Sequence, residues 1–309
     1  MDSFRHEALL YNGDAEFLAG TVPFIEHGIA AGEPVLVVES ARKISMLRGA
    51  LSIGADEVMF ADMSEVGANP ARIIPAWRDF VRLHGAGGKR LRGIGEPIWN
   101  GRTPEELIEC QRHESLLNVA FGHGQPWRLL CPYDMGQLPP QVIDEARRSH
   151  EWLTSAGTEV SSQDYRGIDA CGAPFDTPLD APPAGYREVP FDSDSLLAMR
   201  GLVSRFATAS GLSATRAIEL VTAVNEVATN SVVHGGGSGL LQMWESGGTL
   251  KCDVRDLGNH VAPLVDRERP GADSRDPRGL WLANQVCDLV QIRSIDGGTV
   301  VRLHVKATG

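Results

Sequence analysis

Two polar side chains four residues apart, Glu226 and Asn230, have the chemistry that phosphoryl transfer needs. On an α-helix this spacing places them one turn apart on a single face, and the apolar residues around them recur at helical spacing on another face. A carboxylate there can accept a proton from an attacking hydroxyl, and an amide oxygen is a hard ligand of the kind that Mg²⁺ prefers. The solvated face of an ordinary amphipathic helix would look the same, so the pair alone does not establish a site.

Further residues with uses in nucleotide binding follow in order along the chain. Asp256 and Gly258 stand at the end of an expected strand, Arg278 and Gly279 open a short helix, and Thr299 begins the last strand. A carboxylate can accept a hydrogen bond from an adenine amino group, and glycines permit close backbone approach. The amino end of a helix, with an arginine beside it, attracts phosphates. We therefore interpret the ordered set as a nucleotide site.

The pattern around these residues predicts the elements that position them. A helix is expected at 195–210, followed by a second helix that Ser213 caps and that runs to about His234. Two hairpins, each turning on a Gly-Gly pair, flank the short helix. The irregular stretch 260–277 has the length and composition of a mobile flap. The prediction is helices on one face of a mixed, mainly antiparallel sheet.

This arrangement resembles the GHKL ATPase superfamily, which includes gyrase and the histidine kinases, and within it the anti-sigma-factor serine/threonine kinases. The segment "VTAVNEVATNSVVHGG" is similar to the N-box of that branch, "DVRDLGN" to its G1 box, and "RGLWLANQVCD" to its G2 box. The resemblance covers 188–307 and implies a Bergerat-type α/β sandwich that binds ATP and Mg²⁺. It implies Glu226 as the catalytic base and Asn230 as the magnesium ligand. The other cofactor-binding positions that it implies are His234, Asp256, Gly258, Arg278, Gly279, Leu280 and Thr299.

The sequence departs from the family pattern at two positions. His260 stands where the G1 box has a second glycine, and Pro277 where the G2 box has a glycine. A proline fixes φ and removes an amide donor, so these changes bear on phosphate binding and on closure of the flap.

Two functions are compatible with these residues. In the first, the chain is a kinase that phosphorylates a serine or threonine of an anti-anti-sigma (STAS) protein and sequesters a sigma factor when that antagonist is absent. In the second, the chain is an inactive partner-switch protein that holds a sigma factor or STAS protein with weak or no ATP binding. The sequence does not decide whether the protein also forms a homodimer.

The region 1–154 alternates short apolar segments with helical patterns. Strands are expected at 34–40, 57–62, 91–99 and 127–134, and helices at 15–31, 41–52, 70–83 and 104–121. This alternation predicts an α/β layered domain with a mostly parallel sheet. Residues 155–187 are rich in proline and glycine and are expected to be a linker.

The same region resembles the MEDS sensory domain through "HEALLY", "GEPVLVV", "RGIGEPIW" and "ECQRHESLLN". The resemblance implies a RecA/KaiC-like fold, here without a P-loop, and a small-molecule ligand. Polar or aromatic residues at matching positions, which could line a pocket or be structural, are His6, Glu96, Trp99, His113 and Tyr133. A third hypothesis takes His113, followed by an acid on a helix, as the phosphoacceptor of a histidine kinase.

The composition excludes several other classes of function. The formal net charge is −11 and no Lys/Arg-rich run is present, which argues against direct nucleic-acid binding. No apolar run approaches the roughly 18 residues of a membrane helix, and the amino-terminal residues do not form a signal peptide. The five cysteines are scattered without a C-x-x-C pair, so the sequence predicts a cytoplasmic protein with reduced thiols and without structural zinc.

Overall fold

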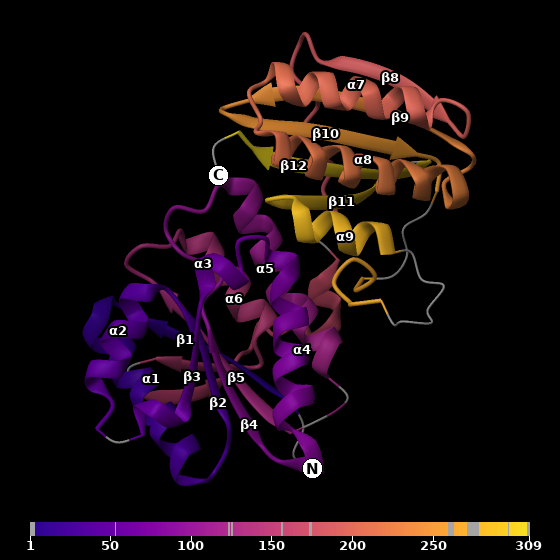
Figure 1. Ribbon diagram of the computed structural model, residues 1–309. Coiled ribbons are helices and arrows are strands. Elements are labelled where there is room, and N and C mark those ends of the chain that lie inside the picture. The colour runs from indigo at the N-terminus through magenta and orange to yellow at the C-terminus, as the bar shows by residue number, and fades with distance from the viewer. Residues whose placement is uncertain are drawn as a thin grey trace. The chain divides into compact units, whose positions relative to one another are not determined.

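The structure, a computed structural model, describes residues 4–52, 54–122, 124, 126–155, 157–172, 175–258, 263–270, 278–295 and 297–307. The chain divides into two compact units, Met1–Phe175 and Asp176–Gly309, which are drawn in Figure 1. Within the described part of the chain, no helix is long and apolar enough to cross a membrane.

The N-terminal unit is built on a seven-stranded sheet in the order β3-β2-β4-β5-β1-β6-β7. Neighbouring strands are parallel, except that β7 pairs antiparallel with β6. The expected mostly parallel sheet is thereby confirmed. The strands are β1 (Arg5–Tyr11), β2 (Val35–Glu39), β3 (Val58–Asp62), β4 (Leu91–Gly95), β5 (Trp127–Asp134), β6 (Trp152–Ser155) and β7 (Thr158–Ser161).

Helices cover both faces of this sheet, as right-handed crossovers between parallel strands require. The helices α1 (Gly13–Ala30) and α2 (Ala41–Ala50) lie together on one face, and α4 (Ile73–His84), α5 (Pro104–Phe121) and α6 (Pro140–Ser149) lie on the other (Figure 1). A single turn of helix, α3 (Met63–Val66), follows β3. The start of α5 is fixed by a capping box in which the Thr103 hydroxyl accepts from Glu106 N and the Glu106 carboxylate accepts from Thr103 N.

The central strand β1 was not among the strands expected from the sequence. Its segment "RHEALLY" begins with three polar residues, two of which are nevertheless buried. Glu7 is paired with Arg128 of β5, and His6 contacts side chains of α5. These partners are more than a hundred residues away, so local hydrophobicity underestimates the burial of this strand.

The segment 155–187, expected to be a linker, contains regular structure in its first half. β7 extends the sheet through its pairing with β6, and a short 3₁₀ helix, Gly167–Cys171, packs against α5. The two compact units meet in sequence at Phe175 and Asp176. A turn at the positive-φ residue Gly157 allows the hairpin, which the glycine-rich composition did not distinguish from a flexible linker.

The C-terminal unit consists of a five-stranded antiparallel sheet in the order β11-β12-β10-β9-β8, with three helices on one face (Figure 1). This is the predicted architecture with one added edge strand, β8. The strands are β8 (Arg187–Asp192), β9 (Ser238–Ser246), β10 (Thr249–Asp256), β11 (Leu289–Ile295) and β12 (Gly298–Lys306). The helices are α7 (Leu196–Ala209), α8 (Ala214–His234) and α9 (Arg278–Val286).

Helix α8 is the central element of this unit. Its N-cap, Ser213, accepts a hydrogen bond from Arg216 N, as the sequence predicted. Its buried stripe packs into the main apolar core of the unit; the stripe consists of Ala217, Leu220, Ala223, Val224, Val227 and Ala228. The stripe fixes the rotation of α8, so Glu226 and Asn230 lie off the core face and are only partly buried.

Candidate functional site

Glu226, Asn230 and Gly279 come together where α9 begins beside α8. A Cβ added at Gly279 would lie 3.0 Å from Asn230 Nδ2 and 3.1 Å from Glu226 Cβ. A larger residue there would require the side chain of Asn230 or the backbone of α8 to shift by a few tenths of an ångström. Asn230 Nδ2 is buried and makes no hydrogen bond to any described residue. The three expected residues therefore lie together where α8 contacts the start of α9, and the Asn230 side-chain amide still has a donor available there.

Asp256 lies on the other side of the last turns of α8, at the end of β10. Its Oδ2 accepts a hydrogen bond from Ser231 Oγ at 2.5 Å, and its Oδ1 accepts one from Gly258 N at 2.8 Å. The backbone packs closely around this carboxylate, because a Cβ at Gly235 would lie 2.5 Å from Asp256 Cγ. Ser231 follows Asn230 directly in α8, so a single turn of this helix positions both halves of the candidate site.

Thr299 and Gly258 are joined across the sheet. Thr299 pairs with Asp256 in the antiparallel register of β10 and β12, and its hydroxyl donates to Gly258 O at 2.6 Å. A Cβ at Gly298 would lie 1.8 Å from Asp256 O, so only glycine fits at the start of β12. Ser231, Gly235 and Gly298 were not predicted as site residues. A serine or a turn glycine does not indicate a binding site in the sequence, because its role depends on which residues lie next to it in the fold.

The remaining expected positions contribute in different ways. Leu280 is 8% exposed and its side chain belongs to the apolar core, so only its backbone could meet a nucleotide. The carbonyl oxygen of His234 would lie 3.2 Å from a Cβ at Gly258, whereas the His234 side chain is exposed. Arg278 is exposed at the first turn of α9.

Part of the expected flap packs against α9. Asn284 donates from Nδ2 to Asp266 O at 3.0 Å, and Asp266 and Arg267 are buried. Within the described residues 263–270, the chain is thus tied to α9 instead of extending freely. The two departures from the family pattern, His260 and Pro277, lie outside the described residues.

This arrangement has the features that a magnesium–nucleotide complex requires. The buried Asn230 Nδ2, which has no partner among the described residues, can donate to a phosphate oxygen, and added Cβ atoms at Gly235 and Gly258 would collide with neighbouring atoms, so these glycines allow close backbone approach. The amino terminus of α9 lies beside Asn230 and Glu226 at Gly279, and a helix amino terminus carries the positive end of the helix dipole. The residues present therefore fit such a ligand.

A cavity of about 280 Å³ opens in the N-terminal unit at the carboxyl ends of its parallel strands. Ligands of open α/β sheets bind at this edge, where connections leave neighbouring strands in opposite directions. Here that point lies between β2 and β4, since β2 leads outward to β3 and β4 leads the other way to β5. The lining includes Tyr11, Glu39, Ser40, Lys43, Met63, Glu96, Ile98, Trp99, Asp134 and Leu138.

A buried network of charges lies at the base of this cavity. Tyr11 donates from its hydroxyl to Glu96 Oε1 at 2.9 Å, and the Lys43 ammonium donates to both Tyr11 and Glu96. Burial, followed by the negative charge of Glu96, raises the pKa of Glu39 well above its usual value. Burial also raises the pKa of Glu96, although Lys43 opposes that shift. The network thus combines one ammonium with carboxyl groups that resist ionisation.

Of the five residues that the sequence suggested for a pocket in this unit, only some line the cavity. Glu96 and Trp99 line the cavity, whereas His6, His113 and Tyr133 are buried among other side chains. Because His113 is 1% exposed in the middle of α5, it is unsuited to receive a phosphoryl group from another domain. Glu39 and Lys43 were missed, although a glutamate at the carboxyl end of a buried parallel strand is a signal that could have found the first.

The Glu39→Gln variant is expected to change how stability depends on pH. A carboxyl whose folded pKa is raised above the ordinary 4.5 holds its proton in the folded state while the unfolded chain loses it, so it lowers stability increasingly as pH rises from 4.5. Glutamine imitates the protonated acid and removes that penalty. Calorimetric unfolding should show a midpoint gain that is absent near pH 4 and grows toward neutrality. The exposed Glu65→Gln is the control, and a gain that does not depend on pH would contradict the prediction.

Comparison with known proteins identifies both units. Residues 5–151 match the family model described as MEDS, MEthanogen/methylotroph, DcmR Sensory domain, and residues 189–305 match the model of a histidine kinase-like ATPase domain. The chain therefore carries a MEDS domain followed by an ATPase domain of the GHKL kind, as the sequence predicted. Such an ATPase domain implies nucleotide binding.

Among solved structures, a match is the crystal structure of the RsbU and RsbW domains of Rv1364c from Mycobacterium tuberculosis. The identity is 18%, with a TM-score of 0.31, and the match covers 40% of this chain and 33% of that chain. None of the curated proteins matches this chain at a significant level.

Proposed function

We propose that this chain is an ATP-dependent serine/threonine protein kinase of the anti-sigma-factor type. It phosphorylates an anti-anti-sigma (STAS) protein within a partner switch, and its N-terminal MEDS domain regulates that reaction. The observation that carries the proposal is the meeting of Glu226, Asn230 and Gly279 beside a fixed Asp256 carboxylate, within a match to an ATPase domain.

The nucleotide is held from both sides of α8. Ser231 Oγ and Gly258 N each donate to one oxygen of Asp256 and so fix the orientation of its carboxylate. In this orientation the carboxylate accepts a further hydrogen bond from the adenine amino group. The Asn230 side-chain oxygen would be a ligand of bound magnesium, and the α9 amino terminus would supply positive potential to the phosphates. Bound Mg-ATP supplies the phosphoryl group, so the task of the protein is positioning and neutralisation of charge.

Glu226 acts on the protein substrate. It is partly exposed, it lies one helical turn from Asn230, and α9 packs closely against it at Gly279. Its carboxylate accepts the proton of the serine or threonine hydroxyl as that oxygen attacks. A partly exposed base suits this role, since the hydroxyl must arrive from a second protein.

The MEDS domain binds a small ligand in the cavity at the carboxyl end of its sheet. Supporting this, the cavity has apolar walls, including Met63, Ile98 and Leu138, and converging polar groups at its base, including Lys43 and Glu96. Its volume of about 280 Å³ suits a molecule of few atoms. Ligand binding there would bias the partner switch.

Calorimetric titration of the full chain with ATP, with and without Mg²⁺, tests the nucleotide site. Magnesium-dependent binding is expected, and Asn230→Ala should weaken it by at least about 10-fold, or 1.4 kcal/mol. Asn225→Ala is a matched control, since it removes the same side chain from α8 about 140° around the helix. Absence of magnesium-dependent binding in the wild type would contradict the proposal and leave a nucleotide-free binding protein.

A further inference from the structure

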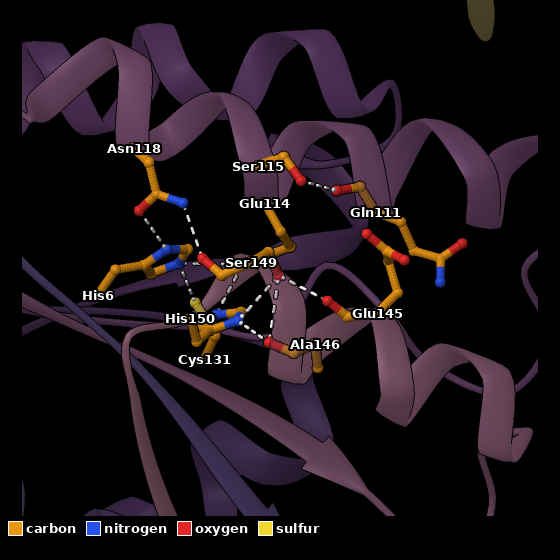
Figure 2. A network of polar contacts seen from close by, with 10 residues as sticks. All are labelled: His6, Gln111, Glu114, Ser115, Asn118, Cys131, Glu145, Ala146, Ser149 and His150. Atoms are coloured by element: carbon orange, nitrogen blue, oxygen red, sulfur yellow. Dashed lines mark hydrogen bonds and ion pairs between the residues drawn. The ribbon is translucent and has the colours of Figure 1, made fainter. Parts of the chain in front are cut away.

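Four metal-ligating side chains converge inside the N-terminal unit (Figure 2), and none of them is among the residues that line the cavity. They are His6 of β1, Glu114 of α5, Cys131 of β5 and His150, which directly follows α6. One ligand atom of each lies within 4.8 Å of all the others. Each residue is at most 3% exposed, so the group is isolated from solvent.

The outer ring nitrogens of both histidines are held by oxygen acceptors. His6 Nδ1 lies 3.1 Å from Asn118 Oδ1, while the amide nitrogen of Asn118 donates to Ser149 O (Figure 2). His150 Nδ1 lies 2.8 Å from Ala146 O. Carbonyl oxygens only accept, so each ring carries its proton on Nδ1. A neutral ring in this state directs the lone pair of Nε2 inward.

Apart from the proton on the Cys131 thiol, the inward atoms are therefore electron donors. His6 Nε2 and His150 Nε2 each lie 3.2 Å from Glu114 Oε2, and His6 Nε2 lies 3.4 Å from Cys131 Sγ. Two lone pairs facing one carboxylate oxygen repel each other unless a cation lies between them. Charging both rings would bury two positive charges against one carboxylate, with ring centroids only 3.9 Å apart.

Two atoms of the cluster lack the hydrogen bonds that a closed protein network would give them. Glu114 Oε1 and His150 Nε2 are buried and have no hydrogen-bond partner among the described residues, although His150 Nε2 is within ion-pair distance of Glu114. Buried polar atoms are ordinarily satisfied, so atoms without partners at a convergence of ligands indicate a missing bound ion.

We propose that His6, Glu114, Cys131 and His150 bind one structural Zn²⁺ ion. Tetrahedral zinc, with bonds of about 2.0–2.3 Å, separates its ligand atoms by about 3.3–3.6 Å. Three of the pairs here are 3.2, 3.2 and 3.4 Å apart, and the others lie within 4.8 Å. Nitrogen and sulfur ligands favour zinc over magnesium or calcium, which prefer oxygen. Binding releases the Cys131 thiol proton, so the thiolate is the ligand.

Asn118 Oδ1 and Ala146 O, which accept hydrogen bonds from the outer ring nitrogens of His6 and His150, would orient the two histidine ligands. Zinc-bound histidines donate their second ring nitrogen to such acceptors, which fix the orientation of the ring. Four protein ligands leave no open coordination position, so the ion has a structural role. It joins α5 and the end of α6 to β1 and β5, whose carboxyl ends supply Tyr11 and Asp134 to the cavity. The ion thus joins two strands whose carboxyl ends contribute to the proposed sensory pocket.

Metal analysis and cobalt substitution of the full chain test this site. Untagged protein is expected to contain one zinc per chain, and Co²⁺ added to chelator-treated protein should give the charge-transfer absorption of a thiolate–cobalt bond. Cys131→Ser should abolish that absorption, and Asn118→Ala should lower zinc affinity by about 10–100-fold through loss of an outer support. Cys110→Ser is the matched control, because Cys110 is an equally buried thiol of α5 outside the cluster.

The wild-type titration alone decides the proposal if a variant fails to fold. Folded wild-type protein that binds neither zinc nor cobalt would overturn it, as would cobalt absorption without a thiolate band. A thiolate band that persists in Cys131→Ser would also overturn it, because the metal would then be bound by another cysteine.

Discussion

Replacing Glu226 by glutamine is expected to slow phosphoryl transfer to a STAS substrate by about 10²–10⁴-fold, the usual contribution of a general base. Glutamine keeps the shape of the side chain but cannot accept the proton of an attacking hydroxyl. ATP binding should stay within a few-fold of wild type, because Asn230, Asp256 and the α9 amino terminus are unchanged. Single-turnover transfer of labelled phosphate, beside calorimetry with ATP, measures both quantities.

The control for this variant is Glu219→Gln on the same helix. Glu219 is paired with Arg216, two turns before Glu226, and contacts none of the candidate site residues described above. It should transfer phosphate at the wild-type rate. If Glu226→Gln transfers as fast as Glu219→Gln, the chain has no general base at this position. A wild-type chain that binds ATP but transfers nothing would favour the partner-binding alternative.

The C-terminal unit was the easier half to predict, because its chemistry is local in sequence. Glu226 and Asn230 are four residues apart, and Asp256 and Gly258 follow one strand, so a single helix and a single strand end position them. The missed strand β8 contains Pro190 and is mostly exposed. Proline is tolerated at the edge of a sheet, and β8 is an edge strand, but on its own such a segment is indistinguishable from a linker.

The sites of the N-terminal unit were harder to predict from the sequence, because their residues come from segments that are far apart in the chain. His6, Glu114, Cys131 and His150 follow no metal-binding spacing, and the absence of C-x-x-C pairs predicted that structural zinc was absent. Parallel strands separated by helices bring such residues together only after folding. The proposed zinc site therefore reverses the expectation from the sequence, for a reason that spacing could not reveal.

Replacing Asp256 by asparagine is expected to weaken ATP binding by about 10–150-fold, as loss of a hydrogen bond to a charged group implies. The fold should tolerate the change. The asparagine oxygen can keep the hydrogen bond from Gly258 N, and the Ser231 hydroxyl, which now faces an amide nitrogen, still has Val227 O as an acceptor at 3.2 Å. The lost property is the negative charge and the free lone pair offered to an adenine amino group.

The same variant distinguishes adenine recognition from general damage to the site. Weaker ATP binding should be accompanied by a smaller preference for ATP over GTP, because the guanine ring has an oxygen where adenine has its amino group. Glu245→Gln, at the opposite end of the β9–β10 hairpin, should bind ATP as the wild type does. If Asp256→Asn weakens the binding of ATP and of GTP equally, the carboxylate supports the structure of the pocket but does not recognise the adenine base. In that case the adenine contact must be assigned to another group beside Thr299.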